Sequence, residues 1–353
     1  MPVDLPTPFV TVDADVLDRN LRAMAATAAE RGLALRPHAK THKCLEIGRR
    51  QVGLGASGLS VATVREAEVF ADGGLDDLFI AYPVWPSPHR ATRLRELAGR
   101  VSLRVGVDSA ESAEALGTAI PGLEVLVEID SGHRRSGVTP GCAGAIAVAA
   151  DAARLRVRGV FTFPGHGYGP SRQRSAQEEE VAALAVAATS VTAAGLDAGV
   201  VSGGSTPTAA LTTAGPMTEM RPGVYAFGDA QQLELGTCDW TDIALTVTAT
   251  VVSRQGSRVL VDAGGKALGA DRQPWATGHG RLLDHPEARI VALSEHHATV
   301  TMPDGAPLPS LGDTLRIVPN HVCAAVNLAD ELIVLSGGDQ VDVWPVAARG
   351  ANT

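Results

Sequence analysis

The stretch LALRPHAKTHK, Leu33–Lys43, decides the fold that the sequence predicts. Its apolar start favours a strand, and helix-forming residues follow its basic end directly. In a parallel α/β protein the charged groups therefore lie at the carboxyl end of a strand, where ligands bind. A lysine with cationic neighbours, which lower the pKa of an amine, can serve there as a Schiff-base amine or a general base, so Lys40 is the first catalytic candidate. The alternative is a solvated basic turn.

The same change from strand to helix repeats along the first two thirds of the chain. Eight apolar extended segments alternate with segments of helical spacing rich in Ala, Glu and Arg, which predicts an α/β fold, a (β/α)8 TIM barrel. The predicted strands are Leu33–Lys40, Gly58–Thr63, Asp77–Tyr82, Val101–Asp108, Leu123–Asp130, Arg156–Phe163, Ala198–Gly204 and Met220–Gly228. The predicted helices are Asp15–Arg31, Thr63–Ala71, Pro88–Ala98, Ser109–Leu116, Cys142–Ala153 and Ser175–Ala194.

The pattern changes near Asp239. Short, alternating, β-branched segments separated by Gly, Pro and Asp turns predict a second, all-β domain. The opening segment Phe9–Val12 is β-rich and precedes the first helix, so it is a candidate for the second sheet. We therefore predict a barrel domain over residues 13–235 and a β domain built from residues 1–12 and 236–353. Its predicted strands are Ile243–Val252, Arg258–Val261, Arg289–Leu293, Ala298–Met302, Thr314–Val318 and Glu331–Leu335.

Composition restricts the class of protein. The 353 residues are 45% hydrophobic and 20% charged, which is ordinary for a globular protein. A net charge of −9 argues against nucleic-acid partners, which need a basic face. No apolar run approaches the ~20 residues of a membrane span, and the N-terminus lacks the features of a signal peptide. The four cysteines form no Cys-x-x-Cys pair, so we expect a cytoplasmic protein with no membrane partner.

The barrel hypothesis predicts that unusual polar residues gather at the carboxyl ends of strands. The segment SGGST, Ser202–Thr206, follows the seventh predicted strand. Its glycines permit close approach of a ligand, and its N–H groups and the hydroxyls of Ser205 and Thr206 can surround a phosphate. A Gly-rich turn is the alternative. The other strand ends carry Lys40 and His42, Thr63, Tyr82, Asp108, Asp130 and Arg135, His166 and Tyr168, and Tyr225 and Asp229.

The segment PNHVC, Pro319–Cys323, is the second chemical motif. His321 and Cys323, at i and i+2, point the same way on extended backbone and suit two ligands of one zinc ion. Two protein ligands leave positions for substrate and water, as a catalytic metal site requires. The alternative is a buried histidine beside a buried thiol.

In combination, these motifs resemble the fold-type III pyridoxal-phosphate enzymes with an alanine-racemase-like barrel. Within that group the chain most resembles the D-serine dehydratase / D-threonine aldolase family. The resemblance runs nearly end to end, and the RPHAKTHK and PNHVC segments are its most specific parts. The matching segments, in order, are TPFVTVDADVLDRN, LRPHAKTHKC, GASGLSVATVREAEV, VEIDSGHRRSGV, SGGSTPT, EMRPGVYAFGD, VDAGGKAL and PNHVCAAVNL.

The resemblance implies pyridoxal 5'-phosphate and a divalent metal, zinc in the first instance, as cofactors. It makes Lys40 the Schiff-base lysine, with Lys43 as a second candidate because the motif contains both. It places Arg135 on the side of the ring hydroxyl and Tyr168 at the ring or the substrate, and His42 is a further catalytic candidate. The implied phosphate ligands are Gly203, Gly204, Ser205, Thr206, Gly223 and Tyr225, and the implied metal ligands are His321 and Cys323.

The implied function is a lyase acting on β-hydroxy D-amino acids. In a dehydratase the metal acts as a Lewis acid on the β-hydroxyl, and the products are a 2-oxo acid and ammonia. In an aldolase the Cα–Cβ bond breaks, and glycine and an aldehyde leave. Family dehydratases tend to carry His-x-Cys and aldolases His-x-Asp, so Cys323 favours elimination. The chain departs from its relatives at SEHHA, Ser294–Ala298, and at ADRQPWATGHG. Which side chain of the D-amino acid substrate the enzyme accepts therefore stays open.

Two further functions rank below these. A racemase would need no metal, and a non-catalytic pyridoxal-phosphate carrier on a related barrel usually lacks a second domain. The β domain and the PNHVC motif argue against both. The expected partners are a small D-amino acid substrate and, by analogy with fold-type III relatives, a second copy of the chain in a homodimer.

Overall fold

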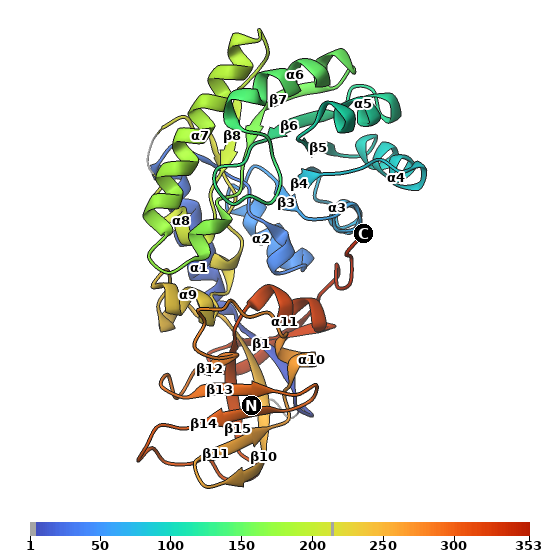
Figure 1. Ribbon diagram of the computed structural model, residues 1–353. Helices are drawn as coiled ribbons and strands as arrows, with labels where there is room; N and C mark the ends of the chain where they lie inside the picture. The colour runs from blue at the N-terminus through green and yellow to red at the C-terminus, as the bar shows by residue number, and fades with distance from the viewer. Residues whose placement is uncertain (1–4, 213–214) are drawn as a thin grey trace. The chain divides into compact units, whose positions relative to one another are not determined.

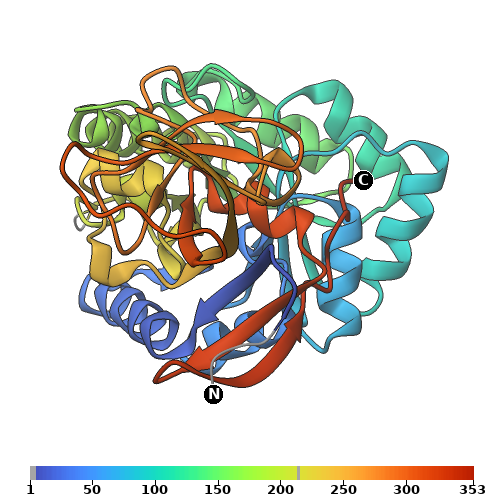
Figure 2. The ribbon, with the colours of Figure 1, turned by 90° about the horizontal axis from the view of Figure 1, so that it is seen from below.

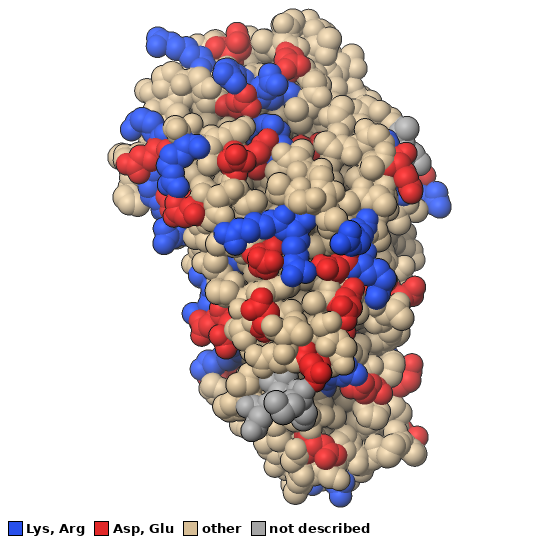
Figure 3. All heavy atoms as spheres, turned by 180° about the vertical axis from the view of Figure 1, so that it is seen from behind, with Lys and Arg blue, Asp and Glu red and all other residues tan. Residues whose placement is uncertain are grey.

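The computed structural model describes residues 5–212 and 215–353, and the chain divides into two compact units. The barrel unit contains residues 24–40, 47–223 and 351–353, and the β unit contains residues 41–46, 224–350 and those before Met24. On the face drawn in Figure 3, basic and acidic side chains are interspersed. Among the described residues, no helix combines the length and the apolar character that a membrane span requires.

The barrel unit is built around a sheet whose parallel strands follow the order β2-β9-β8-β7-β6-β5-β4-β3 (Figure 1). The Ser57 N–H donates to the Leu35 carbonyl and the Ser60 N–H to the Pro37 carbonyl, each at 2.8 Å, which joins the first strand in the chain to the second. These bonds close the sheet, so the predicted barrel is confirmed. The strands are β2 (Ala34–Leu35), β3 (Leu59–Val61), β4 (Asp77–Pro83), β5 (Ser102–Val107), β6 (Glu124–Glu128), β7 (Arg156–Phe161), β8 (Val200–Gly203) and β9 (Glu219–Met220).

Helices lie on the outside of this sheet (Figure 1), and local sequence sets where several of them begin. Thr63 Oγ1 accepts the Glu66 N–H at 2.9 Å at the start of α3, and Ser109 Oγ accepts the Ser112 N–H at 3.2 Å at the start of α5. Such caps satisfy N–H groups that the first helical turn leaves without a partner. The helices up to residue 212 are α1 (Ala14–Glu30), α2 (Leu45–Gly53), α3 (Val64–Asp72), α4 (Pro88–Ala98), α5 (Ala110–Ala119), α6 (Ala143–Ala152), α7 (Gln173–Ala193) and α8 (Thr206–Ala209).

The interior of the barrel combines an aromatic core with a buried ionic network. Phe79, Leu126 and Phe161 are fully buried, and the two aromatic rings meet edge to face with centroids 5.0 Å apart. Arg36, which is 1% exposed, pairs with Asp77 and with Glu219, each at 2.7 Å. A buried cation with two carboxylate partners is compensated, whereas removal of one partner would leave an isolated charge.

Two predicted barrel strands are much shorter in the structure. The segment Leu33–Lys40 is a strand only at Ala34–Leu35, and the segment Met220–Gly228 ends its strand at Met220. Pro37 and Pro222 follow these ends closely, and proline has no N–H for a strand hydrogen bond. The eighth strand therefore lies earlier in the sequence than predicted, and Val224–Ala226 forms a 3-10 helix instead.

The β unit is built around a mostly antiparallel sheet of the order β13-β14-β11-β10-β1-β16-β17, with β15 paired to β10 and to β12. The predicted place of Phe9–Val12 in this second sheet is confirmed, because β1 (Phe9–Asp13) pairs antiparallel with β10 and parallel with β16 (Figure 2). The other strands are β10 (Leu245–Gln255), β11 (Arg258–Val261), β12 (Gly280–Leu282), β13 (Arg289–Leu293), β14 (Ala298–Thr301), β15 (Thr314–Pro319), β16 (Glu331–Ser336) and β17 (Asp339–Pro345).

The predicted second, β-sheet domain is confirmed, and its sheet is accompanied by short helices that the sequence did not predict. Three short helices lie in it, α9 (Ala230–Leu235), α10 (Gly265–Leu268) and α11 (Val322–Leu328). Each has only four to seven residues, too few for a clear period in an apolar pattern. Asp229 marks the start of α9 by accepting the Gln232 N–H at 2.9 Å.

Candidate active site

Three predicted catalytic residues of the barrel unit gather around the ring of Phe163. Lys40 Nζ lies 5.5 Å from the ring centroid, and the guanidinium carbon of Arg135 lies 5.2 Å from it. The Tyr168 ring is 6.1 Å from the same ring, centroid to centroid. Both cations are within the distance at which an aromatic face attracts a positive charge. The structure therefore brings together residues that follow β2, β6 and β7.

A local turn presents Arg135 at this place. Asp130, just after β6, accepts the N–H groups of Gly132 at 2.8 Å and Arg134 at 2.9 Å through Oδ1. These bonds wrap the chain around the carboxylate, and Arg134 takes a positive φ of 58° as a result. Arg135 follows directly, with its guanidinium 4.0 Å from Glu128 Oε1.

The SGGST loop follows β8, as predicted, and its backbone is tightly organised. Gly204 has φ +82°, a conformation that favours glycine. A Cβ on Gly203 would lie 2.5 Å from Glu180 Oε1, so a side chain here would displace the Glu180 carboxyl group. The Gly204 N–H donates to Glu180 at 2.6 Å, and the Ser205 N–H donates to Thr208 Oγ1 at 3.0 Å. Two of the predicted phosphate donors are thus used within the protein.

Arg221 is a buried polar residue of the barrel that the sequence reasoning missed. Its guanidinium donates to the Thr162 carbonyl at 2.5 Å and to the Ser202 hydroxyl, and it packs against the rings of Phe79 and Phe161. Burial lowers the pKa of Arg221, and nearby carboxylates, Glu219 first, offset part of that effect. Arg221 directly follows β9, so the rule about strand ends would have found it had the last strand been placed correctly.

Glu128 is a second buried group that the prediction did not use. Burial raises its pKa to about 6, although the Ser136 hydroxyl donates to Oε1 at 2.9 Å and Arg135 lies nearby. Glu128 ends β6, at the carboxyl edge of the barrel. Carboxyls with raised pKa values at such an edge are common at functional sites.

In the β unit, His321 and Cys323 come together, but not on extended backbone as predicted. His321 is the N-cap of α11 and Cys323 lies in its first turn. His321 Nδ1 lies 3.3 Å from Asp229 Oδ2, and Cys323 Sγ lies 3.4 Å from Thr41 Oγ1. A carboxylate at one ring nitrogen leaves the other nitrogen for a metal, as second-sphere carboxylates do at zinc sites. Asp229 follows the eighth predicted strand, but the sequence alone assigns it no role.

The electrostatics of this pair favour a cation. Burial lowers the pKa of His321, but Cys323 and Asp229 outweigh it and raise the pKa well above the usual value near 6.5. A thiolate and an imidazole form a donor set that suits zinc. Within residues 5–212 and 215–353, no group of three or more His, Cys, Asp or Glu side chains is arranged to hold a metal. His321 and Cys323 supply two donors, which fits a metal site with two protein ligands and open positions.

His42 and Lys43 also belong to the β unit. His42 is fully buried, and its Nδ1 accepts the Cys44 N–H at 3.1 Å. Lys43 has a positive φ of 49°, and its Nζ donates to Asn327 Oδ1 at 2.7 Å. Tyr225 lies in the 3-10 helix Val224–Ala226 and is 9% exposed.

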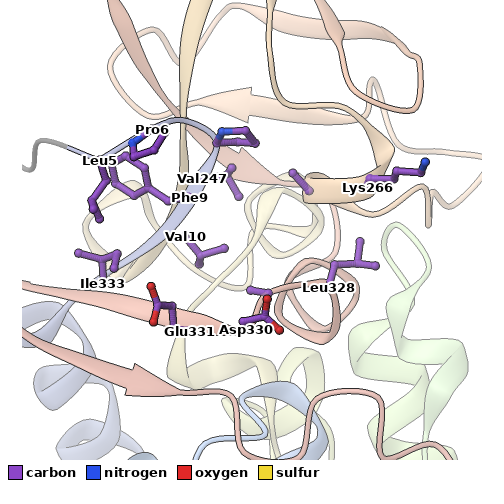
Figure 4. A pocket seen from close by; sticks show the side chains of 13 residues that line it. Leu5, Pro6, Phe9, Val10, Val247, Lys266, Leu328, Asp330, Glu331 and Ile333 are labelled. Atoms are coloured by element: carbon purple, nitrogen blue, oxygen red, sulfur yellow. The ribbon is translucent and has the colours of Figure 1, made fainter.

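A cavity of about 590 Å³ in the β unit is separate from all predicted site residues (Figure 4). It lies between β1 on one side and α10, the end of α11 and the start of β16 on the other. Its lining is mainly apolar, and its charged members Lys266, Asp330 and Glu331 form no acid–base or metal-binding set. The candidate active site is therefore identified by the chemistry of its side chains and does not coincide with this cavity. The lining residues are Leu5, Pro6, Pro8, Phe9, Val10, Val247, Lys266, Ala267, Leu328, Ala329, Asp330, Glu331 and Ile333.

Comparison with known families agrees with this architecture. The alanine racemase N-terminal domain family matches residues 12–231, and the serine dehydratase domain family matches residues 244–335. The chain belongs to the fold-type III pyridoxal-phosphate enzymes. The observed barrel and second sheet are those of the alanine-racemase-like members of this family.

Several relatives of this chain match nearly its whole length, and two of them are 35% identical to it. D-threo-3-hydroxyaspartate dehydratase of Delftia sp. is 35% identical over 370 residues, 96% of this chain and 97% of that protein. D-threonine aldolase of Arthrobacter sp. is 35% identical over 364 residues, 98% of this chain and 93% of that protein. The solved structure of the Delftia dehydratase, 34% identical, covers 97% of both chains with a TM-score of 0.89. A cysteine-to-alanine variant of that dehydratase has been solved in its metal-free form.

Proposed function

We propose that this fold-type III enzyme is a pyridoxal-phosphate- and divalent-metal-dependent dehydratase of β-hydroxy D-amino acids, forming a 2-oxo acid and ammonia. The observation that carries the proposal is the His321–Cys323 pair, with Asp229 at the histidine. It suits a metal that polarises a β-oxygen, which a racemase or a carrier would not need. The relatives that match the whole chain include a dehydratase and an aldolase of such substrates.

The residues of the barrel unit fit the cofactor. Lys40 would hold pyridoxal phosphate through its amine, and Arg135 and Tyr168, which share the Phe163 ring with it, would contact the pyridine ring. Gly203, where a Cβ would displace the Glu180 carboxyl group, and Gly204 shape the loop that would hold the phosphate. The further proposed phosphate ligands are Ser205, Thr206, Gly223 and Tyr225. When bound, pyridoxal phosphate withdraws electrons from the α-carbon of an amino acid.

Lys40 is the proposed base for the α-proton. Its amine and the Arg135 guanidinium both lie over the Phe163 ring, and a nearby cation favours the uncharged form of an amine. With the cofactor bound, the Lys40 amine would lie where it could accept the α-proton of the substrate. His42 stays a predicted catalytic residue, and the Cys44 N–H already occupies its Nδ1.

His321 and Cys323 are the proposed ligands of a zinc ion or another divalent ion. The metal, when bound, supplies a Lewis acid for the β-oxygen of the substrate. Asp229 would orient the His321 ring, and the Thr41 hydroxyl would lie within hydrogen-bond distance of the Cys323 sulfur. The cysteine in this position favours loss of the hydroxyl group over cleavage of the carbon chain.

Retro-aldol cleavage to glycine and an aldehyde is the second candidate. The aldolase relative matches this chain at the same identity as the dehydratase relative, 35%. A product assay decides between them. Protein loaded with pyridoxal phosphate and zinc is incubated with D-serine, D-threonine and D-3-hydroxyaspartate, and the products are quantified. We expect 2-oxo acid and ammonia in equal amounts, and glycine with an aldehyde as the main products would refute the dehydratase proposal.

We further propose that the enzyme is cytoplasmic and forms a homodimer. All four cysteines are free in the structure, as a reducing compartment allows. The dimer rests on analogy with fold-type III relatives. Light scattering of the purified protein tests it, since a monomer mass at micromolar concentration would contradict it.

A further inference from the structure

The carboxyl group of Glu180 lies against the SGGST loop of the barrel unit. Glu180 is on α7 and has no exposed surface. Its Oε1 accepts the Gly204 N–H at 2.6 Å, and the same oxygen occupies the space of a Cβ on Gly203. Glu180 therefore fixes the peptide between Gly203 and Gly204, and with it the direction in which the following loop residues point.

The second oxygen of Glu180 is in an unusual position for a carboxylate. Oε2 is buried and has no hydrogen-bond partner in the part of the chain that the structure describes. The charged group that acts on Glu180 is Arg221, which also interacts with Glu219 and Glu128 and donates its hydrogen bonds elsewhere. One shared cation does not compensate a fully buried charge, so the neutral acid costs less than the carboxylate.

The proton affinity of the group agrees with this geometry. Burial raises the pKa of Glu180 to about 7, although the Gly204 N–H and Arg221 both lower it. The group therefore changes its charge in the neutral range, where a bound phosphate is dianionic.

We propose that Glu180 is a positioning residue that holds the SGGST loop for the cofactor phosphate as a neutral carboxylic acid. This inference rests on the proposed function, in which the loop binds phosphate. A negative charge on Glu180 would repel the phosphate, so phosphate binding and protonation of Glu180 favour each other. Glu180 acts on the phosphate through the Gly204 peptide and does not touch the reacting atoms.

The test compares the affinity of cofactor-free, full-length protein for pyridoxal phosphate with its affinity for pyridoxal, which lacks the phosphate. Both aldehydes react with Lys40, so the ratio of the two dissociation constants isolates the phosphate contribution. Glu180→Gln keeps an oxygen for the Gly204 N–H but cannot ionise. The preference for pyridoxal phosphate is the dissociation constant of pyridoxal divided by that of pyridoxal phosphate. When pH rises from about 6 to about 8.5, we expect this ratio to fall about tenfold more in the wild type than in Glu180→Gln. The phosphate of the free cofactor also changes its charge in this pH range, but this affects both proteins equally and cancels when the wild type is compared with Glu180→Gln.

Glu178→Gln is the matched control, because Glu178 is an exposed carboxylate on the same helix. It should behave like the wild type. The same pH dependence in wild type and Glu180→Gln overturns the inference. A wild type that binds pyridoxal phosphate no better than pyridoxal at any pH overturns instead the assignment of this loop to phosphate.

A second measurement needs no variant. Calorimetry in two buffers of different ionisation heat gives the protons taken up on binding near pH 7.5. We expect binding of pyridoxal phosphate to take up more protons than binding of pyridoxal, because only the phosphate group drives protonation of Glu180. Equal uptake for the two aldehydes contradicts the proposal.

Discussion

Oδ2 of Asp229 lies 3.3 Å from Nδ1 of His321, and the Asp229 carboxylate is completely buried. Its Oδ1 accepts the Gln232 N–H at 2.9 Å, and Oδ2 also accepts the Val322 N–H at 3.2 Å. One side chain thus connects the start of α9 to the start of α11 and orients the ring of a proposed metal ligand. The imidazole presents its other nitrogen, Nε2, for a metal.

Asp229→Asn should weaken metal binding more than it weakens the fold. Asparagine can still cap α9, but a neutral amide is a poorer partner for a metal-bound imidazole, so we expect metal affinity to fall about 10–100-fold. Competition with a zinc-binding dye measures it. Asp239→Asn, at an exposed aspartate in the same unit, is the control. Unchanged zinc affinity in Asp229→Asn would remove Asp229 from the metal site.

Lys40→Ala and Lys43→Ala should have different effects. We expect Lys40→Ala to abolish the visible absorbance of the lysine-bound cofactor. Lys43→Ala should keep that absorbance but lose the bond to Asn327, at a cost of about 1–3 kcal/mol in folding free energy. Absorbance spectra and thermal melts of both variants measure these effects. Full visible absorbance in Lys40→Ala would transfer the covalent role to Lys43.

Cys323→Ala should reduce bound metal and dehydration together and leave cofactor absorbance intact. The substitution removes one of two proposed metal ligands and changes no residue that is proposed to hold the cofactor. Metal content by elemental analysis and 2-oxo acid formation are the two readouts. Cys142→Ala, at an exposed cysteine, is the matched control. Activity that survives both Cys323→Ala and treatment with a chelator would refute a catalytic metal.

Glu128→Gln should stabilise the protein more at high pH than at low pH. Burial raises the pKa of Glu128 from an ordinary 4.5 to about 6, so the folded state binds this proton more tightly than the unfolded state does. The stabilisation that comes from the protonated Glu128 is therefore complete at pH values below the pKa of this group in the unfolded state. It is lost as pH rises through the higher pKa of Glu128 in the folded state. The free energy of unfolding falls by about 2 kcal/mol through this effect between low and high pH, and glutamine, which cannot ionise, removes that loss. Thermal melts near pH 4 and pH 8 measure it, with exposed Glu114→Gln as the control; an equal effect at both pH values would contradict the shift.

The barrel and its strand-end residues were predictable because they follow local rules. Each strand–helix unit carries its own apolar pattern, and polar residues after a strand are recognisable without knowing the neighbours. Phe163 shows the limit. It was the last residue of a predicted strand, and nothing in its sequence context marks the ring that Lys40, Arg135 and Tyr168 share.

The buried ionisable groups were missed for a different reason. Glu180 lies within a long helical segment, QEEEV, where it is indistinguishable from its exposed neighbours Glu178 and Glu179. Arg221 fell inside a strand that was placed too late. Burial of a charge depends on what packs against it, and no local pattern reports that.

By itself, the sequence determined the order of strands and helices, the second sheet with its N-terminal strand, and the short motifs around Lys40, Ser205 and His321. Hydrophobic period and turn residues act over a few positions, so these features are legible in the chain. Only the tertiary structure decided that Glu180 supports Gly204 and that Asp229 holds His321. Those pairs are 24 and 92 residues apart. Their contacts exist because folding buries charged groups that must then find partners, and the choice of partner is made in three dimensions.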